Sequence, residues 1–328
     1  MKGFSFRVIA AMIALVLIAA GCGQQEPSAP EHPEAGAPTG SFSKLHKGAA
    51  GEDLKITSDA LDAINVMLAK EGKEYRVAYA EYITSGESNE VGQTIYARNV
   101  GNKQLGADFV PGDPRRGGRY DVTWINDAFD GSATGGLTPA VTYAAIGRAM
   151  DTWQNVQCST IPLTNLGSYN FDFGYVQYLV GMGGVGGWAA DITHAGWLPK
   201  AFFNAISPPN GGDFILGVTF TFIWVSGGQP TDIDNNGKTD VAFREIYYNN
   251  GFPWQINGTY DVETIALHEA GHGLSQAHFG KVFRTTANGK LHFSPRAVMN
   301  AVYAGVQQQL LGTDEAGHCS IWANWPNH

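Results

Sequence analysis

The first region with a clear hydrophobic pattern lies within residues 49–115. Apolar side chains recur at helical spacing over residues 60–68, and Gly72 then supplies a stop. Apolar and polar side chains alternate over residues 75–83, which predicts a strand, and residues 94–100 could form a second strand that pairs with it. We therefore expect a small α/β unit here. The pattern leaves open whether this unit is a propeptide, an exosite or a fixed layer.

The remainder of the chain alternates between strands and longer helices. A strand begins at Tyr120 and is followed by a helix over residues 139–156, with Thr138 as its cap and proline at the favoured first position. Residues 214–225 are dense in β-branched and aromatic side chains and predict the strongest strand of the chain. Residues 116–328 are therefore expected to form one α+β domain.

The N-terminal residues carry targeting signals rather than part of the fold. Basic side chains precede an apolar run of thirteen residues, 8–20, which is too short to span a membrane and is typical of a secretory signal. Residues 19–22, Ala-Ala-Gly-Cys, resemble a bacterial lipobox, in which Cys22 is the lipidated first residue of the mature chain. Residues 1–21 are thus expected to be a lipoprotein signal peptide, and residues 22–48, rich in Pro, Ala and Gly, a flexible linker. A lipid at Cys22 would anchor the protein at the outer membrane or the cell surface, and ordinary secretion is the alternative.

Composition narrows the classes of partner. The net charge is −9 and only 16% of the residues are charged, so nucleic acid is a poor partner for this chain. The length allows one large domain or two modest ones.

The chemistry of the chain concentrates in the segment His268-Glu-Ala-Gly-His272-Gly-Leu-Ser-Gln-Ala-His278. The first two histidines are four residues apart, so on a helix their imidazoles lie one turn apart on the same face and can bind one zinc ion. Asp261 is placed to cap that helix, and the glycine after His272 favours a break that would let His278 return as a third ligand. Three protein ligands leave one position open for water, as in catalytic zinc sites. Glu269 would then handle the proton of that water.

This segment resembles the HExxHxxGxxH motif of the metzincin metallopeptidases, and the matrixin branch in particular. The family has a methionine turn beneath its zinc site, and the segment around Met299 is similar to it. Tyr303 follows by four residues, as in matrixins, where such a tyrosine lines the S1′ pocket. The resemblance covers residues 116–325 and implies a twisted mixed β-sheet, a long first helix, an active-site helix, the methionine turn and a last helix. It also implies that the strand at 214–225 is the edge along which an extended peptide binds, with a buried central strand as the alternative.

Two positions depart from the family pattern. Ser275 stands where the motif has glycine, so a residue with a Cβ must make the turn before His278, at a cost of about 1–2 kcal/mol if its φ is positive. Matrixin proenzymes carry a Pro-Arg-Cys-Gly segment whose thiolate caps the zinc, but the comparable residues 114–117 have Arg116 in place of the cysteine. Arginine cannot bind zinc, so latency through a cysteine is not expected.

A second candidate metal site follows the strongest predicted strand. Asp232, Asp234, Asn236 and Asp240 stand at positions one, three, five and nine of a loop with glycine at position six, as in the first part of a calcium-binding loop. The twelfth position is Phe243 rather than glutamate, which excludes a complete EF-hand. Structural Ca²⁺ is one interpretation, and an Asx-rich turn between strands is the other.

Two cysteines remain once Cys22 is set aside. In an exported chain such a pair favours a disulfide, here between Cys158 and Cys319. The bond would join the first helix of the expected catalytic domain to its last.

These features predict a monomeric zinc-dependent endopeptidase that acts on proteins or peptides outside the cytoplasm, with Glu269 as general base and acid. One alternative is a surface-displayed binding or adhesion module with structural zinc, although a structural site has no need of a general base. The other is a zinc amidase that acts on cell-wall peptides. One catalytic zinc is expected, because the sequence has no His-x-Asp companion for His194 that would complete a second zinc site. His292 and His318 are expected to be surface or structural residues.

Overall fold

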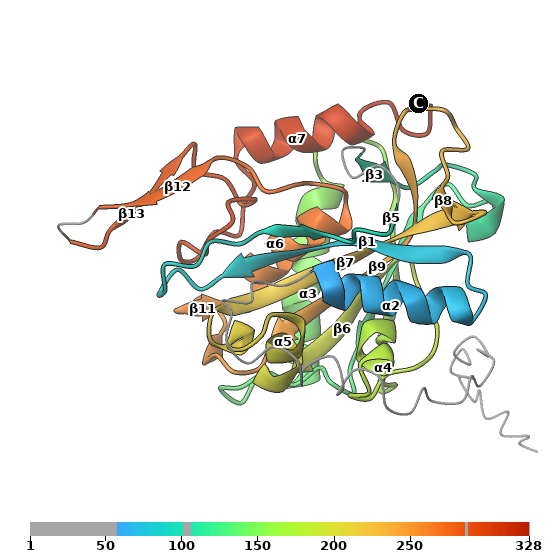
Figure 1. Cartoon of the computed structure of the whole chain (residues 1–328). Coiled ribbons are helices and arrows are strands. Elements are labelled where there is room, and N and C mark those ends of the chain that lie inside the picture. The colour runs from blue at the N-terminus through green and yellow to red at the C-terminus, as the bar shows by residue number, and fades with distance from the viewer. Residues whose placement is uncertain (1–57, 101–105, 286–287, 328) are drawn as a thin grey trace, which may run out of the picture. The chain divides into compact units, whose positions relative to one another are not determined.

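The computed structural model describes residues 58–100, 106–285 and 288–327. All of them lie in the second of the two units into which the chain divides, residues 32–328. Cys22, the expected signal peptide and the expected linker therefore lie outside the described residues. The described part is built around one mixed β-sheet of nine strands, accompanied by six α-helices (Figure 1).

The sheet joins strands from early and late parts of the chain. Its strands are β1 Tyr75–Thr84, β2 Thr94–Tyr96, β3 Ala107–Asp108, β4 Val122–Asp127, β5 Leu163–Tyr169, β6 Ile192–Leu198, β7 Ile215–Ser226, β8 Gln229–Pro230 and β9 Thr239–Asn249. They follow the order β2-β1-β7-β9-β6-β4-β5, with β3 beside β9 and β8 beside β7. β1 is antiparallel to β2 and to β7, and β7 is antiparallel to β9, whereas β9, β6, β4 and β5 run parallel.

The helices and two small strand pairs complete the described part. The α-helices are α2 Ser58–Lys70, α3 Pro139–Gln154, α4 Tyr175–Leu179, α5 Lys200–Ile206, α6 Val262–Gly273 and α7 Gly312–Trp322. The small pairs are β10 Trp254–Gln255 with β11 Tyr260–Asp261, and β12 Lys281–Arg284 with β13 Leu291–Ser294.

Local chemistry explains where the two long predicted helices begin. Pro139 occupies the first turn of α3, where its missing N–H and fixed φ do no harm, and the helix ends at Gln154. α6 begins after Asp261, whose carboxylate accepts a hydrogen bond from the Thr264 N–H at 3.0 Å. The helix and the two strands predicted before residue 100 also form, as α2, β1 and β2.

β7 is the strand expected over residues 214–225, but its place in the sheet corrects the expectation of a free edge. β1 pairs with it along one side, from Tyr75 to Thr84, and β9 pairs with it along the other. The edge expectation is therefore wrong at this strand, and the alternative of a buried central strand is correct. The physical reason is that the segment before residue 115 supplies a partner strand, so the sheet continues across the boundary expected there.

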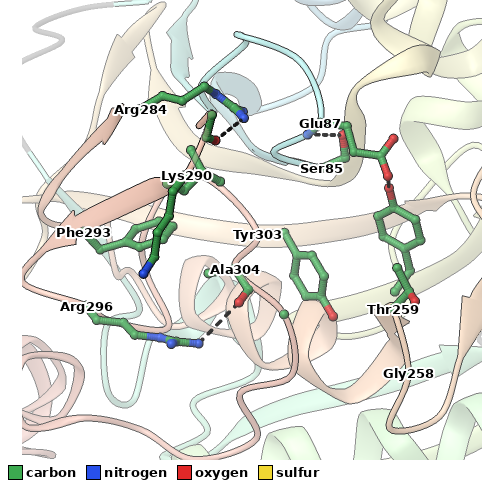
Figure 2. A pocket seen from close by; sticks show the side chains of 14 residues that line it. Ser85, Glu87, Gly258, Thr259, Arg284, Lys290, Phe293, Arg296, Tyr303 and Ala304 are labelled. Carbon is green, nitrogen blue, oxygen red and sulfur yellow. Dashed lines mark hydrogen bonds between the residues drawn. The ribbon is translucent and has the colours of Figure 1, made fainter. Parts of the chain in front are cut away.

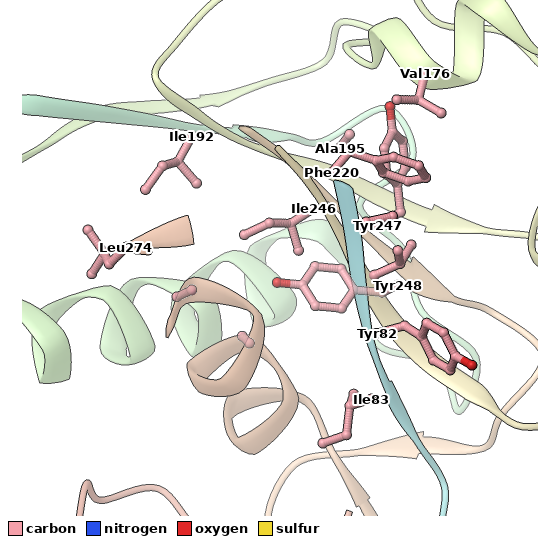
Figure 3. Packing of buried hydrophobic residues seen from close by; sticks show 14 of the residues in the cluster. Tyr82, Ile83, Val176, Ile192, Ala195, Phe220, Ile246, Tyr247, Tyr248 and Leu274 are labelled. Carbon is pink, nitrogen blue, oxygen red and sulfur yellow. The ribbon is translucent and has the colours of Figure 1, made fainter. Parts of the chain in front are cut away.

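α3 and α6 lie side by side and pack against the sheet. Trp153 of α3 is fully buried, and its Nε1–H donates a hydrogen bond to the Leu267 carbonyl of α6 at 2.8 Å. Ile192, Ile246 and Leu274 are fully buried where the end of α6 meets the sheet (Figure 3). Each such side chain contributes about 1.5–3 kcal/mol by its removal from water. This packing gives α6 a fixed position.

The expected disulfide is present. Cys158 lies just after α3 and Cys319 lies in α7, and their Cα atoms are 5.7 Å apart. Disulfides persist in oxidising compartments, so this bond is consistent with a protein that works outside the cytoplasm. Among the described residues, every helix is too short or too polar to cross a membrane.

Candidate metal centre

Three histidine side chains converge at the C-terminal end of α6. His268 and His272 belong to the helix, and His278 to the segment that follows it. The Nε2 atom of His272 lies 3.1 Å from that of His268 and 3.2 Å from that of His278. Tetrahedral zinc with nitrogen ligands at 2.0–2.1 Å places those nitrogens about 3.3 Å apart. The three side chains therefore fit a zinc ion.

Backbone carbonyls determine which imidazole nitrogens face one another. The Nδ1 of His268 lies 2.7 Å from the Val298 carbonyl oxygen, and the Nδ1 of His272 lies 2.7 Å from the Gln276 carbonyl oxygen. Because a carbonyl only accepts hydrogen bonds, each Nδ1 carries a proton and each Nε2 keeps a lone pair for a metal. Burial, together with the neighbouring His272, lowers the pKa of His268 and of His278 well below its usual value. Both rings are therefore neutral, which is the form that binds metal.

The turn that returns His278 is made by a residue with a Cβ, as the sequence requires. Ser275 takes a φ of 68°, in the left-handed region, which costs about 1–2 kcal/mol for a residue other than glycine. Arg244 of β9 stabilises the turn, because its Nη1 donates to the Gly273 carbonyl at 2.7 Å and to the Ser275 Oγ at 3.0 Å. Hydrogen bonds to a charged group contribute about 1.5–3 kcal/mol, which offsets the strain.

Glu269 lies beside the histidines on α6 and is fully buried. Its Oε2 accepts a hydrogen bond from the Thr219 Oγ1 of β7 at 2.6 Å, while its Oε1 has no hydrogen-bond partner of good geometry among the described residues. A methyl group at Gly217 would lie 2.8 Å from Oε1, so glycine at this position leaves the carboxylate its space. Burial raises the pKa of Glu269 to about 7, against the opposing charge of His272. A carboxyl group that titrates near neutrality can both accept and return a proton.

The turn that contains Met299 also holds the centre. Met299 is buried against α6, where a methyl group at Gly271 would clash with its sulfur. Asp314 of α7 accepts hydrogen bonds from the N–H groups of Val298 and Met299 at 2.9 and 3.1 Å. Since the Val298 carbonyl holds His268, the last helix positions a metal ligand through this turn.

Tyr303 forms one wall of a pocket of about 610 Å³ beside the centre (Figure 2). Its hydroxyl accepts a hydrogen bond from the Asp261 N–H at 3.1 Å, and its ring stacks on that of Tyr260 at a centroid separation of 5.9 Å. A second, narrower cavity is lined by Tyr303, His268 and Ile83. Tyr303 is thus a fixed wall between the histidines and an open pocket.

The expected calcium ligands lie in the loop between β8 and β9. The carboxylates of Asp232, Asp234 and Asp240 are close to one another. Asn236, however, turns its Nδ2 rather than its oxygen toward Asp234, at 3.2 Å, and Asp240 forms an ion pair with Arg115 at 2.7 Å. These contacts are those of an Asx-rich turn, so bound Ca²⁺ remains a prediction.

Another acidic cluster among the described residues had no signal in the sequence. Asp127, the last residue of β4, lies together with Asp130 and Asp172, which follow β4 and β5. The Gln177 Nε2 donates to Asp130 and Asp172 at 3.0 and 3.2 Å, and Asp127 accepts from the backbone N–H groups of Asp130 and Phe173. Protein donors therefore satisfy these carboxylates.

Sequence reasoning missed one residue at the metal centre, Glu81. β1 brings its carboxylate to 3.2 Å from the Nδ1 of His272, and its side chain is 5% exposed. Burial opposes the charge of Glu81, but the partner His272 outweighs this effect and lowers the pKa of Glu81, while Glu81 in turn raises the pKa of His272. The strand alternates apolar and polar side chains and also contains Arg76, so a carboxylate at this position is no clear signal. Only the pairing of β1 with β7 brings it to the histidines.

Arg116, at the position expected for a thiol lock, lies away from the histidines. Its Nε donates to Asp191 at 2.8 Å, both side chains are fully buried, and the guanidinium lies 4.8 Å from the centroid of the Phe109 ring. Its role is structural. The three histidines without an expected metal role have aromatic neighbours instead: His194 stacks on Tyr248, His292 on Phe283 and His318 on Trp153.

No model of a known protein family matches this chain, and no curated protein matches it either. The functional argument therefore rests on the geometry of the three histidines, on Glu269, and on the carbonyl groups that orient the ligands.

Proposed function

We propose that the protein is a zinc-dependent endopeptidase of the metzincin kind. The observation that supports this most directly is the approach of three imidazole Nε2 atoms, at 3.1 and 3.2 Å, beside the buried carboxylate of Glu269. The parts that the family resemblance implies also have counterparts here. These are the mixed sheet, the long helix α3, the helix α6 with the histidines, the turn at Met299 and the last helix α7.

His268, His272 and His278 would hold the zinc ion through their Nε2 atoms. When bound, the ion would lower the pKa of a coordinated water towards about 7 and polarise the carbonyl of a substrate. Glu269 accepts the proton of the attacking water and returns it to the leaving amine. Thr219 holds one oxygen of this carboxylate, which leaves Oε1 for the proton.

The disulfide between Cys158 and Cys319 and the targeting signals of the sequence support action outside the cytoplasm. We propose that the chain is a monomer, anchored at the cell envelope by a lipid on Cys22, and that its substrates are proteins or peptides in that compartment.

Zinc content and cleavage of casein over a prolonged incubation test this function. Glu269→Ala should retain zinc and lose cleavage by about 100-fold or more, because it removes the proton carrier but no ligand. Glu263→Ala is the matched control, since Glu263 lies on the same helix but pairs with Arg148 away from the histidines. Equal cleavage by the parent chain and the Glu269 variant would contradict the mechanism. A zinc-loaded chain that cleaves no protein, whether in the parent or in any variant tested, would favour the structural-zinc alternative.

A further inference from the structure

Strand β1 lies where an extended peptide would bind. Peptides commonly bind by adding a strand to an exposed sheet edge. Among the strands that follow residue 115, β7 is the last on its side of the sheet, and only β1 and β2 lie beyond it. Without residues 75–96, β7 would therefore be an edge strand next to the metal centre.

The register of β1 places one peptide bond of the chain at the centre. Ile83 pairs with Gly217, the residue that gives the Glu269 carboxylate its space. The Ile83 N–H lies close enough to that carboxylate to stabilise its charge. The Ile83 side chain is 3% exposed and lines the narrow cavity with His268 and Tyr303. The bond between Tyr82 and Ile83 thus faces Glu269, with the two side chains on opposite sides of β1 (Figure 3).

The residues on either side of this bond are also held as a bound peptide would be. Thr84 donates its N–H to the Ala301 carbonyl at 3.5 Å and accepts the Tyr303 N–H at 2.8 Å, so it lies between β7 and the pocket wall. Before the bond, the Glu81 carboxylate lies 3.2 Å from the Nδ1 of His272. That Nδ1 is turned away from the converging Nε2 atoms, so Glu81 orients the His272 ring from outside the ligand set.

The carbonyl of Tyr82 is enclosed rather than presented for attack. The Tyr82 N–H donates to the Gln93 carbonyl at 3.2 Å, and the Gly92 N–H donates to Ala301 at 2.8 Å. A methyl group at Gly92 would clash with the Tyr82 carbonyl oxygen, so the Gly92 backbone packs directly on that atom. β2 and the residues before it therefore close the side of β1 that is turned away from β7.

We propose that β1 is an internal inhibitor that occupies the peptide-binding edge in the register of a substrate, with Ile83 lining the narrow cavity beside His268. The intact chain is then latent, and displacement or removal of β1 activates it. This inference rests on the proposed peptidase function. It replaces the thiol lock that Arg116 excludes with a lock made by strand pairing.

Two valines permit a matched test. Val77 lies in β1 and Val122 in β4, and both are fully buried. Val77 is far from the histidines along its strand and exchanges two hydrogen bonds with Asn65 of α2, both at 2.8 Å. Val77→Ala weakens the packing that holds β1 in the sheet. Val122→Ala weakens the packing of β4, on the other side of the sheet.

The first experiment measures whether β1 occupies the edge of β7, in chains that cannot catalyse cleavage. In full-length, zinc-loaded chains that also carry Glu269→Ala, a fluorescent peptide copying residues 79–85 is titrated and its anisotropy recorded. Val77→Ala should bind this peptide about tenfold more tightly than the parent. The variant loses two buried methyl groups, which weakens the packing of β1, so the edge of β7 becomes free about tenfold more often. Val122→Ala should bind it as the parent does. Equal peptide affinity in all three chains would overturn the proposal.

The second experiment measures casein cleavage by the same variants with Glu269 intact. Val77→Ala should cleave faster than the parent, with Val122→Ala unchanged. A parent chain that cuts itself between Tyr82 and Ile83 would make β1 a substrate and overturn its inhibitory role. If Val77→Ala binds the peptide more tightly but no variant cleaves casein, the peptidase function is refuted. The occupancy of the β7 edge by β1 is then still supported.

Discussion

The buried ion pair between Arg116 and Asp191 offers a sharp test of how the fold is held. Arg116 donates from Nε and Nη2 to the two carboxylate oxygens of Asp191 at 2.8 and 3.0 Å, and neither side chain is exposed. It also donates to the carbonyls of Val110 and Asp121. Arg116→Met keeps most of the side-chain volume but leaves a buried carboxylate and two carbonyls without this donor.

The expected loss is about 3 kcal/mol in the free energy of unfolding, at the low end for a broken buried pair, because Asp191 stays buried but keeps donors from Arg119 and Thr123. Arg119→Met is the matched control. Arg119 contacts the same Asp191 at 2.7 Å, but its side chain is 36% exposed. Screening by water should limit its loss to about 0–1 kcal/mol.

The measurement is urea unfolding of both variants and the parent near neutral pH, with the disulfide intact and the change followed by tryptophan fluorescence. Metal content is held constant across the samples, since a bound ion adds its own stability. Equal losses in the two variants, or a loss below about 1 kcal/mol for Arg116→Met, would refute the argument that burial decides the strength of this contact.

Three further outcomes follow from named contacts. Burial lowers the pKa of His318 to about 4, so the free energy of unfolding is unaffected by this group above about pH 6.5 and falls as the pH drops from there towards 4. The expected slope is about 1.4 kcal/mol per pH unit, and His318→Phe should remove this part of the pH dependence, as measured by urea unfolding across the range. Gly271→Ala should destabilise the fold by about 1–3 kcal/mol because its methyl group clashes with the Met299 sulfur, and Met299→Ala in the same chain should recover part of this loss rather than add to it. Replacing Cys158 and Cys319 by alanine should lower the free energy of unfolding by about 5 kcal/mol in the chain-entropy model for a loop of 161 residues, and an unchanged urea midpoint would contradict it.

The parts that sequence alone determined are those set by local chemistry. The four-residue spacing of His268 and His272 needs only a helix to place both rings on one face, and Asp261 marks where that helix begins. The disulfide followed from there being one pair of cysteines left after the lipidation site. The sequence placed a sharp turn at Ser275, and the structure shows that its φ is 68°, in the left-handed region.

Tertiary structure alone decided what surrounds those histidines. The sequence pattern of an apolar strand is the same at the edge and in the centre of a sheet. Hydrophobic periodicity indicates which side chains are buried, but not which strand lies next to them. The pairing of β1 with β7 is a contact between residues distant in the chain, and it brings both Glu81 and Ile83 to the metal centre. Strand pairing depends on backbone hydrogen bonds that every residue type except proline can make, so no motif records which strands will meet.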